Sequence, residues 1–88
     1  MLMKDARGQD VGWSAIVIFT YGGELRFGIV CDVFGWECGD VLTRNGNGAD
    51  TKIRCNSKQL MRIRDAQIPI EQVDTILALK RQLMEKST

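Results

Sequence analysis

The chain has 88 residues, of which 44% are hydrophobic and 26% are charged, and its formal net charge is +1 at pH 7. A chain of this length is expected to form a single domain over residues 1–88, because two halves would each be too small to hold a hydrophobic core. The composition excludes a largely disordered protein. The sequence contains no histidine, which excludes a Ser-His or Cys-His catalytic pair.

The sequence favours a cytoplasmic protein that does not enter membranes. The chain does not open with a basic segment followed by an apolar one, which is the pattern of a secretory signal. The longest apolar run, Ala15 to Phe19, is far shorter than a membrane span. Cys31, Cys38 and Cys55 are odd in number and lack the spacing of a disulfide scaffold or a zinc site. We therefore expect thiols, no metal and no cofactor, with Cys31 and Cys55 in the core and Cys38 the accessible one.

Residues 1–11 are polar and predict a flexible lead-in to a β core over residues 12–64. Within this core, residues 13–21 and 24–34 predict two strands. Gly22 and Gly23 between them can adopt the positive φ angles of a tight hairpin turn. A two-residue turn sets the register, so that Ile18 faces Phe27 and Ile16 faces Ile29.

The first strand is apolar on both of its faces from Ala15 to Phe19, whereas a strand with one wet face alternates. The predicted register assigns a core face to Ile16, Ile18, Leu25, Phe27, Ile29 and Cys31. The opposite face then carries Val17, Phe19, Tyr21 and Val30. This second apolar face requires a cover of its own.

The rest of the β core is predicted from shorter signals. Residues 35–40 predict a turn, 41–44 a third strand, 45–50 a loop, and 51–55 a fourth strand. Lys52 and Arg54 are expected on the outer face of that fourth strand, opposite Ile53 and Cys55. Residues 56–59 predict a short helical turn capped by Ser57, and residues 61–64 a fifth strand.

Residues 68–86 predict a C-terminal helix, with Pro69 in its first turn. Apolar residues recur at helical spacing over a wide stripe, at Ile70, Val73, Ile76, Leu77, Leu79, Leu83 and Met84. Two arrangements would cover this stripe and the second face of the first strand. In one, Ile76, Leu79 and Leu83 pack over Val17, Phe19 and Tyr21; in the other, the strand or the helix lies at a subunit interface. Two such apolar surfaces on a short chain favour a homodimer or a higher oligomer.

The segments GGELRFGIVCDV and KIRCNSKQLMRI resemble those of SH3-like small β-barrels, a group that includes Tudor and KOW modules. The resemblance covers residues 13–64 and implies a five-stranded small barrel followed by one helix. A strongly bent antiparallel sheet is the alternative within the same mainly β class. A plasmid-borne type of dihydrofolate reductase is similar in plan, but its Val-Gln-Ile-Tyr motif corresponds here to residues 51–54, which read TKIR. Without the Gln and the Tyr, no site residue is carried over, and an enzymatic function is not favoured.

Charge is unevenly distributed along the chain. Residues 41–64 contain six basic residues and one acidic residue, a net charge of 6 − 1 = +5, which leaves 6 − 10 = −4 for the remainder. The six basic residues are Arg44, Lys52, Arg54, Lys58, Arg62 and Arg64. If the fourth and fifth strands adjoin, four of these cations share one face and attract phosphates. Solvated strand faces that merely protect a sheet edge are the alternative.

Aromatic side chains could complete such a surface. Trp36 and Tyr21 offer planes on which bases stack, although Trp13 and Trp36 are more often core anchors in a domain of this size. The sequence therefore predicts a self-associating, non-enzymatic binding module that contacts a protein or a nucleic acid through a basic strand face. The alternatives are an oligomer whose shared groove binds a small anionic ligand, and an inhibitor of a host protein.

Overall fold

The first hairpin has the register that its sequence predicts. Strands β3 (Ile16–Tyr21) and β4 (Glu24–Val33) are joined by Gly22 and Gly23, whose φ angles are 61° and 79°. Ile16 pairs with Ile29, and Ile18 pairs with Phe27. The structure is a computed structural model that describes residues 2–45 and 47–86. Because glycine adopts positive φ without a steric penalty, the turn sets the pairing of every later residue in the hairpin.

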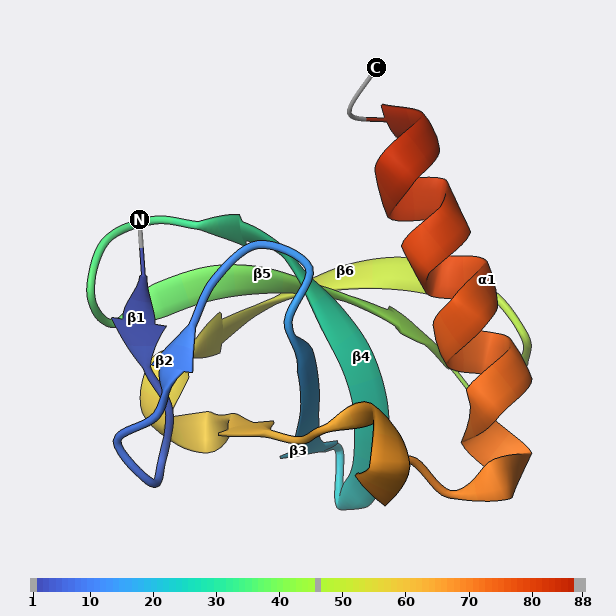
Figure 1. The fold of residues 1–88 in the computed structure, drawn as a ribbon, viewed down its shortest axis with the longest axis horizontal. Helices are drawn as coiled ribbons and strands as arrows, with labels where there is room; N and C mark the ends of the chain where they lie inside the picture. Colours follow the sequence, from blue (N-terminus) through green and yellow to red (C-terminus); the bar gives the residue numbers. More distant parts are fainter. Residues whose placement is uncertain (1, 46, 87–88) are drawn as a thin grey trace.

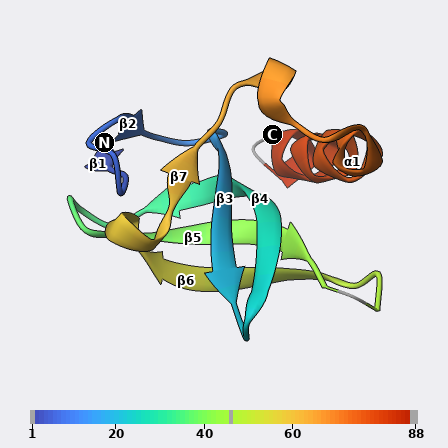
Figure 2. The ribbon, with the colours of Figure 1, turned by 90° about the horizontal axis from the view of Figure 1, so that it is seen from below.

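Five antiparallel strands form one strongly bent sheet, in the order β6–β5–β4–β3–β7 (Figure 2). The three further strands are β5 (Cys38–Arg44), β6 (Asp50–Asn56) and β7 (Met61–Arg62). Strands β6 and β7 are the two edges, so the sheet stays open over the described part of the chain. Of the two architectures expected from sequence, the bent mainly β sheet with one C-terminal helix is therefore the observed one.

Strand β5 begins earlier than the sequence predicts. Its first three residues were expected in a turn, but Gly39 pairs with Val33 on one side and with Cys55 on the other. A Cβ at Gly39 would lie only 2.7 Å from the carbonyl oxygen of Asp32. Because glycine has no Cβ, β5 can approach β4 this closely. The glycine-rich composition of the segment thus reflects tight strand packing as well as turning.

Two shorter segments lie close to their predictions, and only the cap of the second differs. The β5–β6 connection is a loop as expected, in which the side chain of Asn45 accepts hydrogen bonds from the backbone of Asn47 and Ala49 at 2.9 and 3.0 Å. Gly46, part of that predicted loop, lies outside the described residues. The helical turn η1 (Ser57–Gln59) is capped by the side chain of Asn56, whereas Ser57 is buried.

The first residues form a hairpin where a flexible lead-in was expected. Strand β1 (Met3–Lys4) pairs with β2 (Asp10–Val11) to form a separate two-stranded sheet. Met3 and Val11 face each other in this hairpin, and both are fully buried. Each contributes one apolar side chain to a core built by the main sheet, so the short segment is held by tertiary packing.

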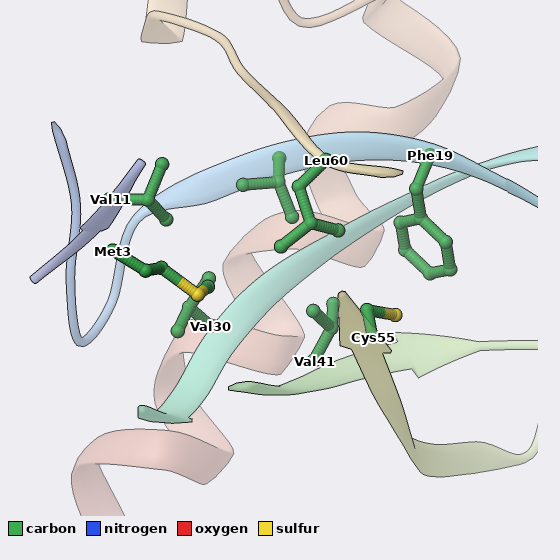
Figure 3. Close-up of a cluster of buried hydrophobic side chains, with 8 residues drawn as sticks. Met3, Val11, Phe19, Val30, Val41, Cys55 and Leu60 are labelled. Atoms are coloured by element: carbon green, nitrogen blue, oxygen red, sulfur yellow. The ribbon is translucent and has the colours of Figure 1, made fainter. Parts of the chain in front are cut away.

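Both faces of the central strands are covered. One face packs into the inner cluster, shown in Figure 3, where Met3 and Val11 of the hairpin lie close to Val30. The inner cluster comprises Met3, Val11, Val17, Phe19, Val30, Val41, Cys55 and Leu60. The other face packs into the helix-side cluster of Ile16, Ile29, Leu42, Ile63, Ile76, Leu79 and Leu83.

Helix α1 (Ile70–Lys86) lies at one side of the molecule, with the N-terminal hairpin at the other (Figure 1). The predicted packing of this helix over Val17, Phe19 and Tyr21 is wrong. Ile76, Leu79 and Leu83 instead contact the face of Ile16 and Ile29. Val17 and Phe19 point into the inner cluster, and Tyr21 remains half exposed. The reason is that the hairpin and η1 already cover the second face, which leaves the first face for the helix.

Candidate functional site

The six basic residues predicted as one patch are divided between different surfaces. Lys52 and Arg54 lie on β6, whereas Arg62 lies on β7 with Arg64 just beyond it. Strands β6 and β7 are at opposite ends of the strand order, because β7 pairs with β3. The four cations were expected to share one face only if these two strands adjoined; they do not, and each pair has its own surroundings.

The larger basic surface follows β7 and is formed by two hollows of about 640 and 570 Å³. Both hollows are lined by Asp10, Arg62, Ile63 and Arg64, so they are parts of one depression, which we call the β7 groove. Five cations line it, namely Lys4, Arg7, Arg62, Arg64 and Lys80. Trp13 lines the same groove and is 46% exposed. Lys4, Arg7 and Trp13 were not assigned to a basic surface from sequence, because the N-terminal hairpin that brings two of them there was not predicted.

A buried carboxylate holds the two segments of the β7 groove together. Asp5 is 3% exposed, and its Oδ1 accepts hydrogen bonds of 2.8 Å from the backbone N–H groups of Arg7 and Gln9. Its Oδ2 accepts one of 2.8 Å from the backbone N–H of Arg62. Burial opposes ionisation of Asp5, but these three hydrogen bonds outweigh it and hold its pKa below the ordinary value. Asp5 thereby fixes Arg7 beside Arg62, and Arg7 Nη2 also donates to the Arg62 carbonyl at 2.6 Å.

The charges in the β7 groove do not cancel. Two acids line it, and each has a lysine partner: Asp10 pairs with Lys4 at 2.5 Å and Asp65 with Lys80 at 3.9 Å. Five cations and two acids give 5 − 2 = +3. The three arginines carry this excess, and Arg62 Nη1 donates to the carbonyl oxygen of Asp10 at 3.1 Å. Each guanidinium has five N–H donors, so most donors stay available to a ligand.

The backbone beside Trp13 has an unusual conformation. Ser14 has φ of 72°, in the left-handed region, and among the described residues it is the only non-glycine with positive φ. Its N–H donates to the carbonyl of Val30 at 2.8 Å, which anchors the turn to β4. A strained backbone conformation of this kind persists only where the surrounding contacts hold it in place, and such residues are common at binding sites. This turn sets the position of Trp13 at the groove.

The second basic surface lies at β6 and is smaller. Tyr21, Arg26, Asn45, Thr51, Lys52, Ile53 and Arg54 line a hollow of about 450 Å³, which we call the β6 groove. Arg26 lies over the ring of Tyr21 at 5.3 Å. Arg54 lies 4.5 Å from the Phe34 ring centre, and its Nε is 3.2 Å from Oδ1 of Asp40. The sequence offered Tyr21 as a stacking surface beside the basic residues, and in this groove it lies with Lys52 and Arg54. Arg26 was not among the predicted basic residues, because these were drawn from residues 41–64 alone.

The remaining predicted contacts lie elsewhere. Arg44 pairs with Asp50 at 2.7 Å, and this hydrogen-bonded partner raises the pKa of Arg44. Lys58 is exposed in η1. Trp36 is 82% exposed in the β4–β5 connection, and it lines neither basic groove. The prediction that Trp13 and Trp36 are core anchors is wrong, because both side chains are exposed and neither belongs to the two clusters.

The cysteines lie close to where the sequence predicts. Cys55 is buried in the inner cluster, and Cys31 packs against the helix-side cluster. Burial raises the pKa of both thiols. Cys38 was expected to be accessible in a turn. It is half-buried instead, because it is the first residue of strand β5. No group of three or more metal-ligating side chains is formed among the residues that the structure describes.

Within the described ranges, no helix has the length and apolar character needed to cross a membrane. Comparison with protein-family models, with curated proteins and with solved structures finds no match for this chain. The geometry of the β7 groove is therefore the main guide to function.

Proposed function

We propose that the protein is a non-enzymatic binding module that holds single-stranded nucleic acid in the β7 groove. One observation carries this proposal: Arg7, Arg62 and Arg64, from distant parts of the chain, line one depression beside a half-exposed Trp13. Guanidinium groups match phosphate oxygens in charge and geometry. An aromatic plane beside them can stack on a base.

The aromatic side chain favours a single strand over a duplex. Bases in a duplex are already stacked on one another, whereas an unpaired base can lie on Trp13 while its phosphates meet the arginines. The sequence alone predicted binding through a basic strand face. The present proposal places binding in the β7 groove, which is a more confined site. The resemblance to SH3-like small barrels stays part of this proposal, supported by five strands in sequence with a helical turn, η1, before the last one.

The test uses a fluorescently labelled oligonucleotide of about 15 nucleotides, within the range that small single-strand binders occupy. Fluorescence anisotropy is measured over a series of salt concentrations. Each phosphate contact in a single strand contributes about −0.7 to the slope of log K against log salt. The double variant Arg62→Glu, Arg64→Glu should therefore reduce the magnitude of this slope by about 1.4, and it should lower the affinity at least tenfold.

A matched control is available in the same chain. Lys52→Glu with Arg54→Glu makes an equal change in net charge at the β6 groove, so its affinity should remain much closer to that of the unaltered protein. Equal losses in both double variants would show that only net charge matters, and this would contradict the proposed site. Absence of binding at low salt would contradict the function itself.

A second candidate function concerns the β6 groove, where Arg26 has an unusual environment. Its Nε is buried and has no hydrogen-bond partner within the described part of the chain, and its Nη2 lies 3.6 Å from Oε2 of Glu24. Lys52 and Arg54 line the same hollow, which suits a small anion. Titration with inorganic phosphate, followed by NMR, should give saturable shifts at Tyr21 and Lys52. Arg26→Gln should abolish these shifts, and shifts that persist in that variant would contradict the assignment.

A further inference from the structure

Helix α1 has a second apolar face, which points away from the sheet. Its first apolar face consists of Ile76, Leu79 and Leu83, all buried in the helix-side cluster. The second consists of Ile70 (86% exposed), Val73 (36%), Leu77 (54%) and Met84 (50%). We call these four residues the outer stripe. At about 100° per residue, its centre lies roughly 120° around the helix from the buried face.

The spacing within the outer stripe is that of a helix-pairing seam. Ile70, Leu77 and Met84 are seven residues apart, and Val73 lies three residues after Ile70. Positions repeated in this way form one narrow line along a helix and are typical of two helices packed side by side. A helix that packs only on its own domain does not need such a line on its solvent side.

We propose that the outer stripe pairs with the same stripe of a second copy of this chain, with the two helices antiparallel around a two-fold axis at Leu77. In this register, Leu77 faces the partner's Leu77, because the position lies on the axis. Ile70 faces the partner's Met84, since both lie seven residues from the centre. The two ends of the stripe therefore cover each other.

The charges beside the stripe select this arrangement. Asp74 and Arg81 lie on the same flank of the outer stripe, at nearly equal distances on either side of Leu77. An antiparallel two-fold pair preserves the flank and reverses the direction, so it brings Asp74 next to the partner's Arg81 in two symmetric contacts. A parallel pair, whose two-fold axis runs along the helices, would instead place the two copies of each charged residue on opposite flanks of the contact, too far apart for Asp74 to pair with the partner's Arg81.

Both charged residues are available for this role. Asp74 and Arg81 are exposed, and within the described residues neither has an intramolecular ion pair. By contrast, Lys80, which lies seven residues after Val73 at the edge of the outer stripe, is paired with Asp65 of its own chain at 3.9 Å. The complementary charges identify a second copy of this chain as the partner.

The placement of the helix permits the approach of a partner. Figure 1 shows α1 along one side of the molecule, with its C-terminal half rising beyond the sheet. A helix of 17 residues is about 26 Å long, so the contact is smaller than most stable interfaces. We therefore expect a reversible dimer that forms at high protein concentration. This inference does not depend on nucleic-acid binding.

The experiment is sedimentation velocity over concentrations from about 10 µM to about 1 mM, the range in which weak complexes dissociate. The mass should rise from 9.9 kDa towards twice that value as the concentration increases. Leu77→Lys places two cations together on the axis, and it should shift the midpoint of association at least tenfold. Circular dichroism should show an unchanged thermal unfolding temperature, because Leu77 is half exposed.

Charge reversal tests the register itself. Asp74→Arg and Arg81→Asp should each weaken association several-fold, and the two together should restore it, because the pairs re-form with exchanged signs. Glu71→Arg, a charge reversal farther round the helix, is the control and should leave association close to that of the unaltered protein. A mass of 9.9 kDa at all concentrations would overturn the proposal. Failure of the double variant to recover would overturn the antiparallel register.

Discussion

Asp5 accepts a hydrogen bond from the backbone N–H of Arg62, a residue 57 positions later in the chain. The same carboxylate accepts from Arg7 and Gln9 within its own hairpin. Loss of this ionised acceptor would leave buried donors with poorer partners, so Asp5→Asn should reduce the free energy of unfolding by about 2 kcal/mol. Urea unfolding measures this change.

The neighbouring acid provides the control for this prediction. Asp10 is exposed and pairs with exposed Lys4. Exposed ion pairs contribute at most about 1 kcal/mol, so Asp10→Asn should change stability much less than Asp5→Asn. Similar losses in both variants would contradict the structural role assigned to Asp5.

Asp5 also predicts how stability depends on pH. Its pKa in the folded protein is below the ordinary value of 3.8, so the unfolded chain binds the proton first as the pH falls. The stabilisation is fully present above about pH 3.8 and is lost as the pH falls through the lowered pKa. Thermal unfolding between about pH 2 and pH 5 should show this loss. The loss should be smaller in Asp5→Asn, and an identical pH profile would contradict the prediction.

Trp13 should contribute to nucleic-acid affinity without contributing to its dependence on salt. Base stacking on an aromatic side chain is worth about 1–3 kcal/mol, so Trp13→Ala should weaken oligonucleotide binding about tenfold. Because no charge is removed, the slope against salt should be preserved. Trp36→Ala is the matched control, since Trp36 is more exposed and lies outside the groove. Equal effects of the two substitutions would argue against the β7 groove.

Gly28 is required by the close packing of strands β4 and β5. A Cβ at this position would lie 2.5 Å from Cγ1 of Val41 and 2.8 Å from the carbonyl oxygen of Leu42. The backbone atom cannot rotate away, so Gly28→Ala should destabilise the protein by about 3 kcal/mol, a typical cost of overpacking. Gly23→Ala, at a turn with open space but positive φ, should cost about 1 kcal/mol. Chemical denaturation of the two variants measures the difference, and the reverse order would contradict this account.

Local signals were sufficient for the central hairpin and the helix. The register of β3 on β4 follows from the two glycines, because a two-residue turn permits one pairing. The burial of Cys55 and the exposure of Arg54 follow from strand alternation within β6. Each of these features depends on residues that are close together in the sequence.

The candidate site could not be assembled from sequence because its parts are distant in the chain. Strands of two residues, such as Met3–Lys4, have too few positions to show a period. The pairing of β7 with β3 through Val17 and Arg62 depends on how the whole sheet bends. The exposure of Trp36 has the same origin, because residues from several strands, the N-terminal hairpin and the helix fill the two clusters. Sequence pattern identified the cations, and tertiary structure decided which of them meet.

The double burial of β3 has a consequence for the order in which the protein is made. One face of the strand is covered by Met3, Val11 and Leu60, and the other by residues 76–83, which leave the ribosome after all three. Ile16 and Ile29 therefore remain uncovered in the growing chain until the helix has been synthesised. Such transiently exposed apolar surface promotes aggregation. The helix, which is synthesised last, therefore determines how long the nascent chain is exposed to aggregation.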